Sequence, residues 1–402
     1  VGIRNNKWLA LKAQNRSLQG LMQSWLRTKA KDLAEFTKVM EMRANTSTNT
    51  MYADDMGNIA YWHGNFIPKR NGSYNWALPV DGSTPATEWQ GLHDLNEIFH
   101  AINPKEGWMQ NCNSSPFNLS GFNSISANAY PSYMAPEGDN FRSQYAIKQL
   151  SALENATIEK MIALGYDHYL SAFDSLLPPL IKDFDALPVM DPVHNNVKEA
   201  IESLRNWDKR SSASSIATTI GVFWAYQVLS KNFPGMPGTI LKDQVKMFTW
   251  NIQHHSSQER LDALQAVLSG LQNKLGSWKI PWGEITRFQR LSGDIRPKFD
   301  AGESSLPVGL GSSVLGSLPS YEAAWLGSKM YGTAGNSFVA VVEFGKRVTA
   351  RSIVTGGSSF QPGSKHFLDQ AQMYIDGKFK DVFFYKGDIV KNGERTYHPG
   401  GE

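Results

Sequence analysis

The side chains best suited to chemistry in this 402-residue sequence lie in one short segment, residues 103–116, which reads N-P-K-E-G-W-M-Q-N-C-N-S-S-P. Asn and Gln side chains carry N–H donors without a charge. A fixed neutral donor is what an acyl-transfer site uses where a carbonyl oxygen becomes an oxyanion. Asn113 is therefore a candidate donor, although an Asn in a loop flanked by Ser and Pro also serves as an ordinary turn former.

Arg142 is a second candidate, because it stands where the loop-rich region containing this segment ends. A guanidinium group can orient a carboxylate or backbone carbonyls with a planar fork of donors. Taken alone, Arg142 also fits an arginine at the start of a helix.

Other groups fit structural roles better than catalytic ones. His366 has Asp369 three residues away, but this spacing is also that of a helix entry. The adjacent pair 254–255 cannot place both imidazoles on one helical face, which disfavours a metal site. Asp54 and its neighbour Asp55 favour a turn, and the single cysteine, Cys112, fits a small buried residue.

Composition excludes several classes of protein. With 41% hydrophobic and 19% charged residues, the chain is typical of a folded globular protein. The formal charge of +3 is small and its cations are scattered, so no nucleic-acid partner is implied. The longest apolar run, residues 216–229, is too short to span a membrane. Phosphate-loop, HExxH zinc and GxSxG motifs are absent from the sequence.

The apolar spacing predicts an α+β fold built as a single domain over residues 1–402. Residues 1–136 contain a helical region, a β-hairpin and a long loop; 137–280 are mainly helical; 281–402 contain strands and a helix. Predicted helices cover 17–44 (as one helix or two), 156–164, 197–207, 214–230, 259–275 and 367–375; predicted strands cover 50–54, 58–63, 337–343 and 348–354. Ser256 and Glu259 form a capping-box signature.

Several motifs, in order along the chain, resemble those of the penicillin acylase family of N-terminal-nucleophile hydrolases. They are Y-A-D through G-N-I-A-Y at 52–61, N-P through N-S-S-P at 103–116, N-F-R at 140–142, L-R-N-W-D at 204–208, P-W-G-E at 281–284, and G-G-S through H-F-L-D-Q at 356–370. The resemblance implies a part of a four-layer αββα N-terminal-nucleophile fold and hydrolysis of linear N-acyl amides. No cofactor is implied for catalysis.

In that family an amino-terminal Ser is the nucleophile, and its own α-amine serves as the base. The motif alignment places the oxyanion-hole amide on Asn113 rather than Asn111, and the active-site arginine on Arg142. The sequence begins with Val1 and contains no Ser-Asn pair, so the Ser is expected to lie outside this chain.

The resemblance therefore implies the later part of a β chain, with an α chain and the start of the β chain as partners and a small N-acyl amide as substrate. This chain alone is then expected to be inactive. It also implies a periplasmic or secreted location and allows a structural Ca²⁺ ion, for which no ligands are named. The alternative is a non-catalytic scaffold or binding module that has lost the nucleophile.

Overall fold

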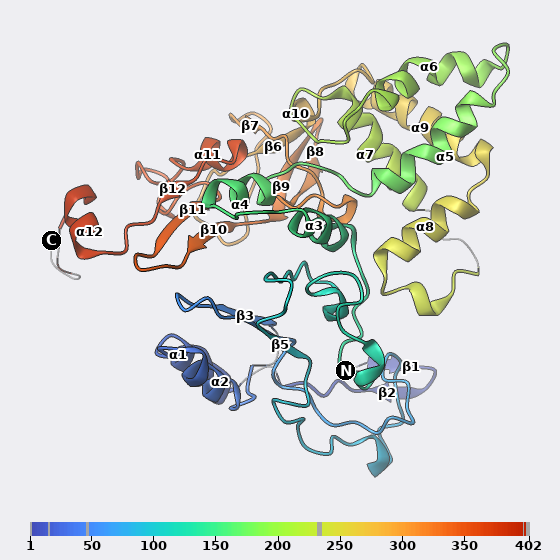
Figure 1. Cartoon of the computed structure of the whole chain (residues 1–402). Coiled ribbons are helices and arrows are strands. Elements are labelled where there is room, and N and C mark those ends of the chain that lie inside the picture. Colours follow the sequence, from blue (N-terminus) through green and yellow to red (C-terminus); the bar gives the residue numbers. More distant parts are fainter. Residues whose placement is uncertain (1, 15–16, 46–47, 231–234, 397, 399–402) are drawn as a thin grey trace. The chain divides into compact units, whose positions relative to one another are not determined.

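The computed structural model describes residues 2–14, 17–45, 48–230, 235–396 and 398. The chain divides into two compact units; the colours in Figure 1 follow the sequence from the N-terminus to the C-terminus. The first unit comprises Val1–Asp139 with Phe344–Arg347, and the second comprises Asn140–Glu343 with Val348–Glu402. The single domain over 1–402 and its internal boundaries stay predictions.

The first unit is built on a small antiparallel sheet of order β3-β4-β5. Its elements are the hairpin β1 (Gly2–Arg4) and β2 (Lys7–Leu9), helices α1 (Leu18–Arg27) and α2 (Leu33–Met40), and strands β3 (Thr50–Ala53), β4 (Ile59–Trp62) and β5 (His100–Ile102). The region predicted as one helix or two is thus two helices, each opened by a side-chain cap from Ser17 or Asp32.

The pleat of this sheet divides the unit's core into two clusters. Ala60 and Trp62 of β4 point to one face, where they pack with Met40 of α2. Tyr61 lies between them in the sequence and therefore points to the other face, where it packs with Phe99 and Leu119. The segment after β5 covers this second face.

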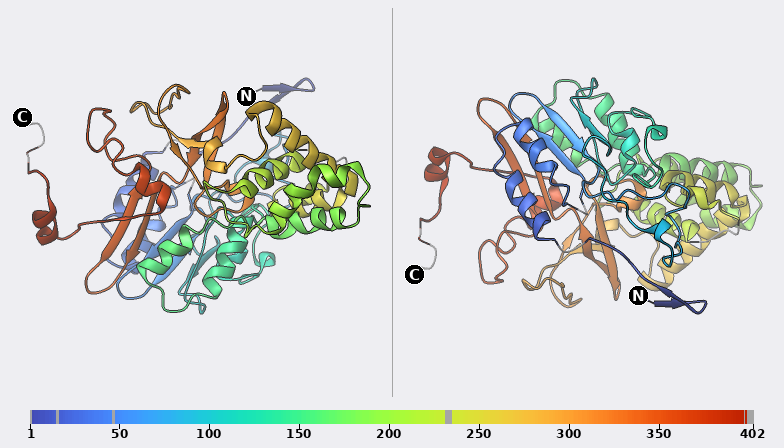
Figure 2. Two further views of the ribbon diagram at one scale, coloured as in Figure 1. Left: turned by 90° about the horizontal axis from the view of Figure 1, so that it is seen from above. Right: turned by 90° about the horizontal axis from the view of Figure 1, so that it is seen from below.

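The second unit contains most of the helices. They are α3 (Phe141–Ser151), α4 (Ile158–Gly165), α5 (Phe173–Asp185), α6 (Pro192–Arg205), α7 (Ile216–Leu229), α8 (Gln244–His254), α9 (Ser257–Leu275), α10 (Trp282–Ile285), α11 (Ala371–Asp376) and α12 (Lys386–Asn392). Helices α5 to α9 gather into a bundle beside the strands of this unit (Figures 1 and 2), and α7, which is apolar on all sides, lies buried within it.

The strands of the second unit form separate sheets of order β7-β6-β9-β8 and β10-β11-β12. Their bounds are β6 (Thr286–Phe288), β7 (Leu306–Pro307), β8 (Tyr321–Leu326), β9 (Lys329–Gly335), β10 (Phe338–Glu343), β11 (Thr349–Val354) and β12 (Lys380–Asp381). The β10–β11 pair confirms the predicted antiparallel strands. In the described part of the chain, none of the helices is both long and apolar enough to cross a membrane.

Candidate active site

The amide-rich loop joins β5 to a short 3₁₀ turn at Pro116–Asn118, within the first unit. Its first residue, Asn103, has a φ of 49°, and Asn113 has a φ of 57°. Asn adopts this left-handed backbone more readily than most residues do. Asn103 uses its side chain to fix the loop to the β3–β4 hairpin, since its Oδ1 accepts from the backbone N–H of Ile59 at 2.8 Å.

Hydrogen bonds hold the loop on both sides of Asn113. On the first side, the buried amide of Gln110 donates to the carbonyl of Asn118 at 3.1 Å, and its oxygen accepts from the backbone N–H of Cys112 at 3.1 Å. On the second side, the backbone N–H of Ser115 donates to the carbonyl of Gly138 at 3.0 Å. The backbone around Asn113 is therefore fixed before any substrate binds, as a catalytic donor requires.

Asn113 itself is exposed, whereas its neighbour Ser114 is only 1% exposed. The Ser114 hydroxyl finds no hydrogen-bond partner among the described residues. A buried hydroxyl without a partner is uncommon and costs about 1–3 kcal/mol.

Arg142 lies in the second unit, at the second position of α3, where it is partly buried. Asn140 caps this helix, and its Oδ1 accepts from the backbone N–H of Ser143 at 2.9 Å. A cation in the first turn opposes the helix dipole, so helix stability does not explain an arginine at this position. Asn113 and Arg142 belong to different units, and the structure fixes the surroundings of each within its own unit.

A chain of polar side chains behind the loop was not predicted from the sequence. Asn111 donates from Nδ2 to the Tyr61 hydroxyl at 3.1 Å, Tyr61 lies 2.9 Å from Nδ1 of His63, and Nε2 of His63 lies 3.2 Å from Glu137. The local signal in the sequence is the Tyr-x-His spacing of Tyr61 in β4 and His63 just after it, because Glu137 lies 74 residues beyond His63.

His366, for which the sequence favoured a structural role, has both ring nitrogens close to carboxylates. Nδ1 of His366 lies 2.7 Å from Asp369, and its Nε2 lies 3.3 Å from Glu394. The hydrogen bond that His366 donates to Asp369, aided by Glu394, raises the pKa of His366 above its ordinary value. Both ring nitrogens are thus engaged, which does not suit a general base.

Asp54 has the turn role expected for it. It accepts from the Tyr52 hydroxyl at 2.8 Å and from the backbone N–H groups of Met56 and Asn58 at 3.0 Å and 2.9 Å. Burial alone would raise the pKa of Asp54, but the bonds from Asn58, Tyr52 and Met56 outweigh it and lower the pKa. His254 and His255 likewise direct Nδ1 to backbone carbonyls one helical turn earlier.

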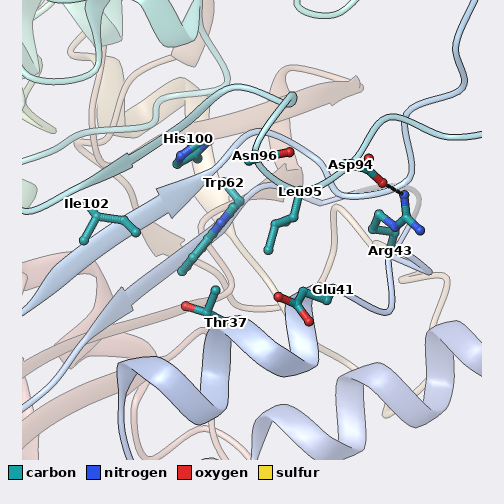
Figure 3. Close-up of a pocket in the computed structure, with 9 residues that line it drawn as sticks. All are labelled: Thr37, Glu41, Arg43, Trp62, Asp94, Leu95, Asn96, His100 and Ile102. Carbon is teal, nitrogen blue, oxygen red and sulfur yellow. Dashed lines mark hydrogen bonds and ion pairs between the residues drawn. The ribbon is translucent and has the colours of Figure 1, made fainter.

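Figure 3 shows a pocket of about 580 Å³ in the first unit, on the sheet face opposite to Tyr61. Trp62, His100 and Ile102 line it from the strands, and Thr37 of α2 lines it from the helix. Adjacent strand residues point to opposite faces, so Trp62 faces this pocket while Tyr61 faces the amide-rich loop. The pocket is therefore separate from the candidate oxyanion site.

Among the described residues, His, Cys, Asp and Glu side chains do not gather in groups of three or more that could hold a metal ion. Ca²⁺ is usually held by six to eight oxygen ligands, several of them carboxylates. A structural Ca²⁺ ion therefore stays a prediction from the family resemblance.

The fold is one found in a solved penicillin acylase structure. It is similar to a thermostable penicillin G acylase from Alcaligenes faecalis in an orthorhombic form, with a TM-score of 0.63 and 19% sequence identity over 95% of this chain and 72% of that one. This similarity confirms the predicted α+β fold class.

The chain belongs to the penicillin amidase family, whose model matches residues 4–391. Family and fold together support an amidohydrolase-like function.

Proposed function

We propose that this chain is the later part of the β chain of a penicillin-acylase-like enzyme that hydrolyses linear N-acyl amide bonds of small molecules, penicillins included. The nucleophile is an amino-terminal Ser that lies outside the 402 residues. Its hydroxyl attacks the amide carbonyl, and its α-amine, with an ordinary pKa of about 8, accepts the proton. The amine accepts it near neutral pH and passes it to the departing amine.

Asn113 acts when negative charge develops on the carbonyl oxygen. Its side-chain N–H donates to this oxygen in the tetrahedral intermediate, then again when water hydrolyses the acyl-enzyme. A neutral donor held in place stabilises this charge without having to reorganise during the reaction. Arg142 is proposed to hold the geometry of the site through its guanidinium group.

One observation carries the proposal for Asn113. The loop bonds at Gln110 and Ser115 hold the backbone on both sides of an exposed, left-handed asparagine. Residues held in sparsely populated backbone regions cluster at functional sites, because the surrounding structure must support them. Asn123 has the same left-handed backbone, so the observation that favours a donor at Asn113 is that hydrogen bonds hold its backbone on both sides.

The proposal includes partner polypeptides: an α chain and the start of the β chain, released from one precursor by self-cleavage. The apolar face of α1 supports this part, because Leu18, Leu21 and Trp25 are 74%, 68% and 65% exposed at helical spacing. The unpartnered Ser114 hydroxyl supports it as well. A periplasmic or secreted location and a structural Ca²⁺ ion in the assembled enzyme rest on the family resemblance alone.

A serine-directed sulfonyl fluoride tests the proposal on the assembled enzyme purified from its source. The enzyme should release an amine and a carboxylic acid from a linear N-acyl amide, and the reagent should stop this by labelling one peptide that begins with Ser. Label on a serine of this chain would contradict the assigned nucleophile. A purified assembly that hydrolyses no amide and takes up no reagent would favour the non-catalytic scaffold.

A further inference from the structure

The hydrogen bonds behind the amide-rich loop have one consistent direction. The Asn111 amide nitrogen can only donate, so the Tyr61 oxygen accepts from it. We assign the Tyr61 O–H as the donor to Nδ1 of His63 over 2.9 Å, and in the corresponding tautomer Nε2 carries the ring proton. Nε2–H donates to the Glu137 carboxylate over 3.2 Å. We call Asn111, Tyr61, His63 and Glu137 the relay.

The middle of the relay is buried in an aromatic setting. Tyr61 is 0% exposed and His63 is 5% exposed, and the Phe99 ring meets both edge-on at 6.1 Å and 6.3 Å. Burial, and to a smaller extent Glu137, raises the pKa of Tyr61, so its hydroxyl keeps its proton. A buried hydroxyl or imidazole that loses its partner is costly, which gives each bond of the relay a strong positional preference.

The relay ends two residues from Asn113. One N–H of the Asn111 amide is committed to Tyr61, which gives Asn111 a structural role in this part of the loop. The loop bonds at Gln110 and Ser115 are to backbone atoms. The Asn111–Tyr61 bond, in contrast, joins a side chain of the loop to a side chain of strand β4.

We propose that Tyr61, His63 and Glu137 are positioning residues that hold Asn113 in place through Asn111. This inference rests on the proposed function, in which Asn113 is the oxyanion donor. If the relay breaks, Asn111 loses its acceptor and the loop can move relative to the sheet. A displacement of about 1 Å at a catalytic group can cost about a hundredfold in rate.

The test is Tyr61→Phe in the assembled enzyme, with Tyr130→Phe as the matched control. Tyr130 packs against the same Phe99 ring at 5.4 Å but lies outside the relay. We expect Tyr61→Phe to lower kcat about tenfold or more with little change in KM, because a misplaced donor acts on the transition state. Hydrogen exchange should quicken in peptides covering 109–115, and Tyr130→Phe should change neither quantity.

A conservative pair tests the far end of the relay. Glu137→Gln keeps an acceptor oxygen for His63 and should retain most activity, whereas Glu137→Leu should lower kcat as Tyr61→Phe does. Unchanged kcat and exchange in Tyr61→Phe would overturn the inference, and so would equal losses in Tyr61→Phe and Tyr130→Phe. If Asn113→Ala keeps its activity, the proposed function fails, while the exchange of the loop still tests the relay.

Discussion

Asn103 Oδ1 accepts a hydrogen bond from the backbone N–H of Ile59 over 2.8 Å, while the φ of Asn103 is 49°. Asn103 therefore adopts a left-handed turn and, through its side chain, ties the start of the amide-rich loop to the β3–β4 hairpin. The second amide atom contributes as well, since Nδ2 donates to Asn58 Oδ1 at 3.0 Å.

Substitution at Asn103 should separate these contributions. Asn103→Gly loses the side-chain hydrogen bonds but adopts the left-handed backbone without strain. Asn103→Ala loses the same bonds and also adds about 1–2 kcal/mol of strain in the left-handed backbone. We expect Tm to fall in the order wild type, Gly, Ala, and exchange of the Ile59 amide to quicken in both variants. An alanine variant as stable as the glycine variant would contradict the strain at this position.

The carboxylate of Asp167 should make the second unit sensitive to acid. Arg210 donates two hydrogen bonds of 2.9 Å to this carboxylate, and the Tyr145 hydroxyl also donates to it. Burial alone would raise the pKa of Asp167, but the bonds from Arg210 and Tyr145 outweigh burial and lower the pKa below its ordinary value.

Because the folded pKa lies below the unfolded value of about 3.9, the stabilisation is present above about pH 4 and is lost as the pH falls through the folded value. Asp167→Asn should therefore cost about 2 kcal/mol in the free energy of unfolding at pH 7. The difference from wild type should shrink towards pH 3 in urea unfolding. If the difference in the free energy of unfolding between Asp167→Asn and wild type does not change with pH, the ionised carboxylate of Asp167 is not its source.

The ion pair between Asp183 of α5 and Arg260 of α9 lies within the helical bundle. Both side chains are about nine-tenths buried, and Arg260 also donates to the carbonyl of Ile252 at 2.8 Å. Asp183→Asn leaves a buried guanidinium without its charge partner and should cost about 3–5 kcal/mol. Asp185→Asn, on the same helix, breaks an exposed pair with Arg205 and should cost less than about 1 kcal/mol. Equal losses in the two variants would contradict the role of burial.

Local sequence signals predicted the elements that depend on neighbouring residues. The Asp54 turn joins the predicted hairpin, and the capping box of Ser256 and Glu259 opens α9 as expected. Helix α5 was missed because Pro178 and Pro179 lie inside it, where its packing in the bundle overrides their helix-breaking tendency. Strand β9 was missed because its glycines obscure the alternation of its side chains.

In the candidate site, too, the features with a local signal in the sequence were predicted and those that depend on distant contacts were not. The type and spacing of residues 103–116 identified the amide-rich loop, and its left-handed Asn113 is consistent with a constrained position. The relay could not be predicted, because Tyr61 and His63 read as ordinary strand residues until the fold brings Glu137 and Asn111 to them. Contacts between distant segments carry no local signature in one sequence.

The central claim, that Asn113 donates to the oxyanion, is tested most directly by kcat of Asn113→Gly in the assembled enzyme. Glycine keeps the left-handed backbone without strain, so only the amide is lost. Asn123→Gly, at another exposed asparagine with a φ of 53°, is the control. We predict that kcat falls about a hundredfold or more in Asn113→Gly while Tm stays close to that of the control. An Asn113→Gly enzyme with wild-type kcat would contradict the account.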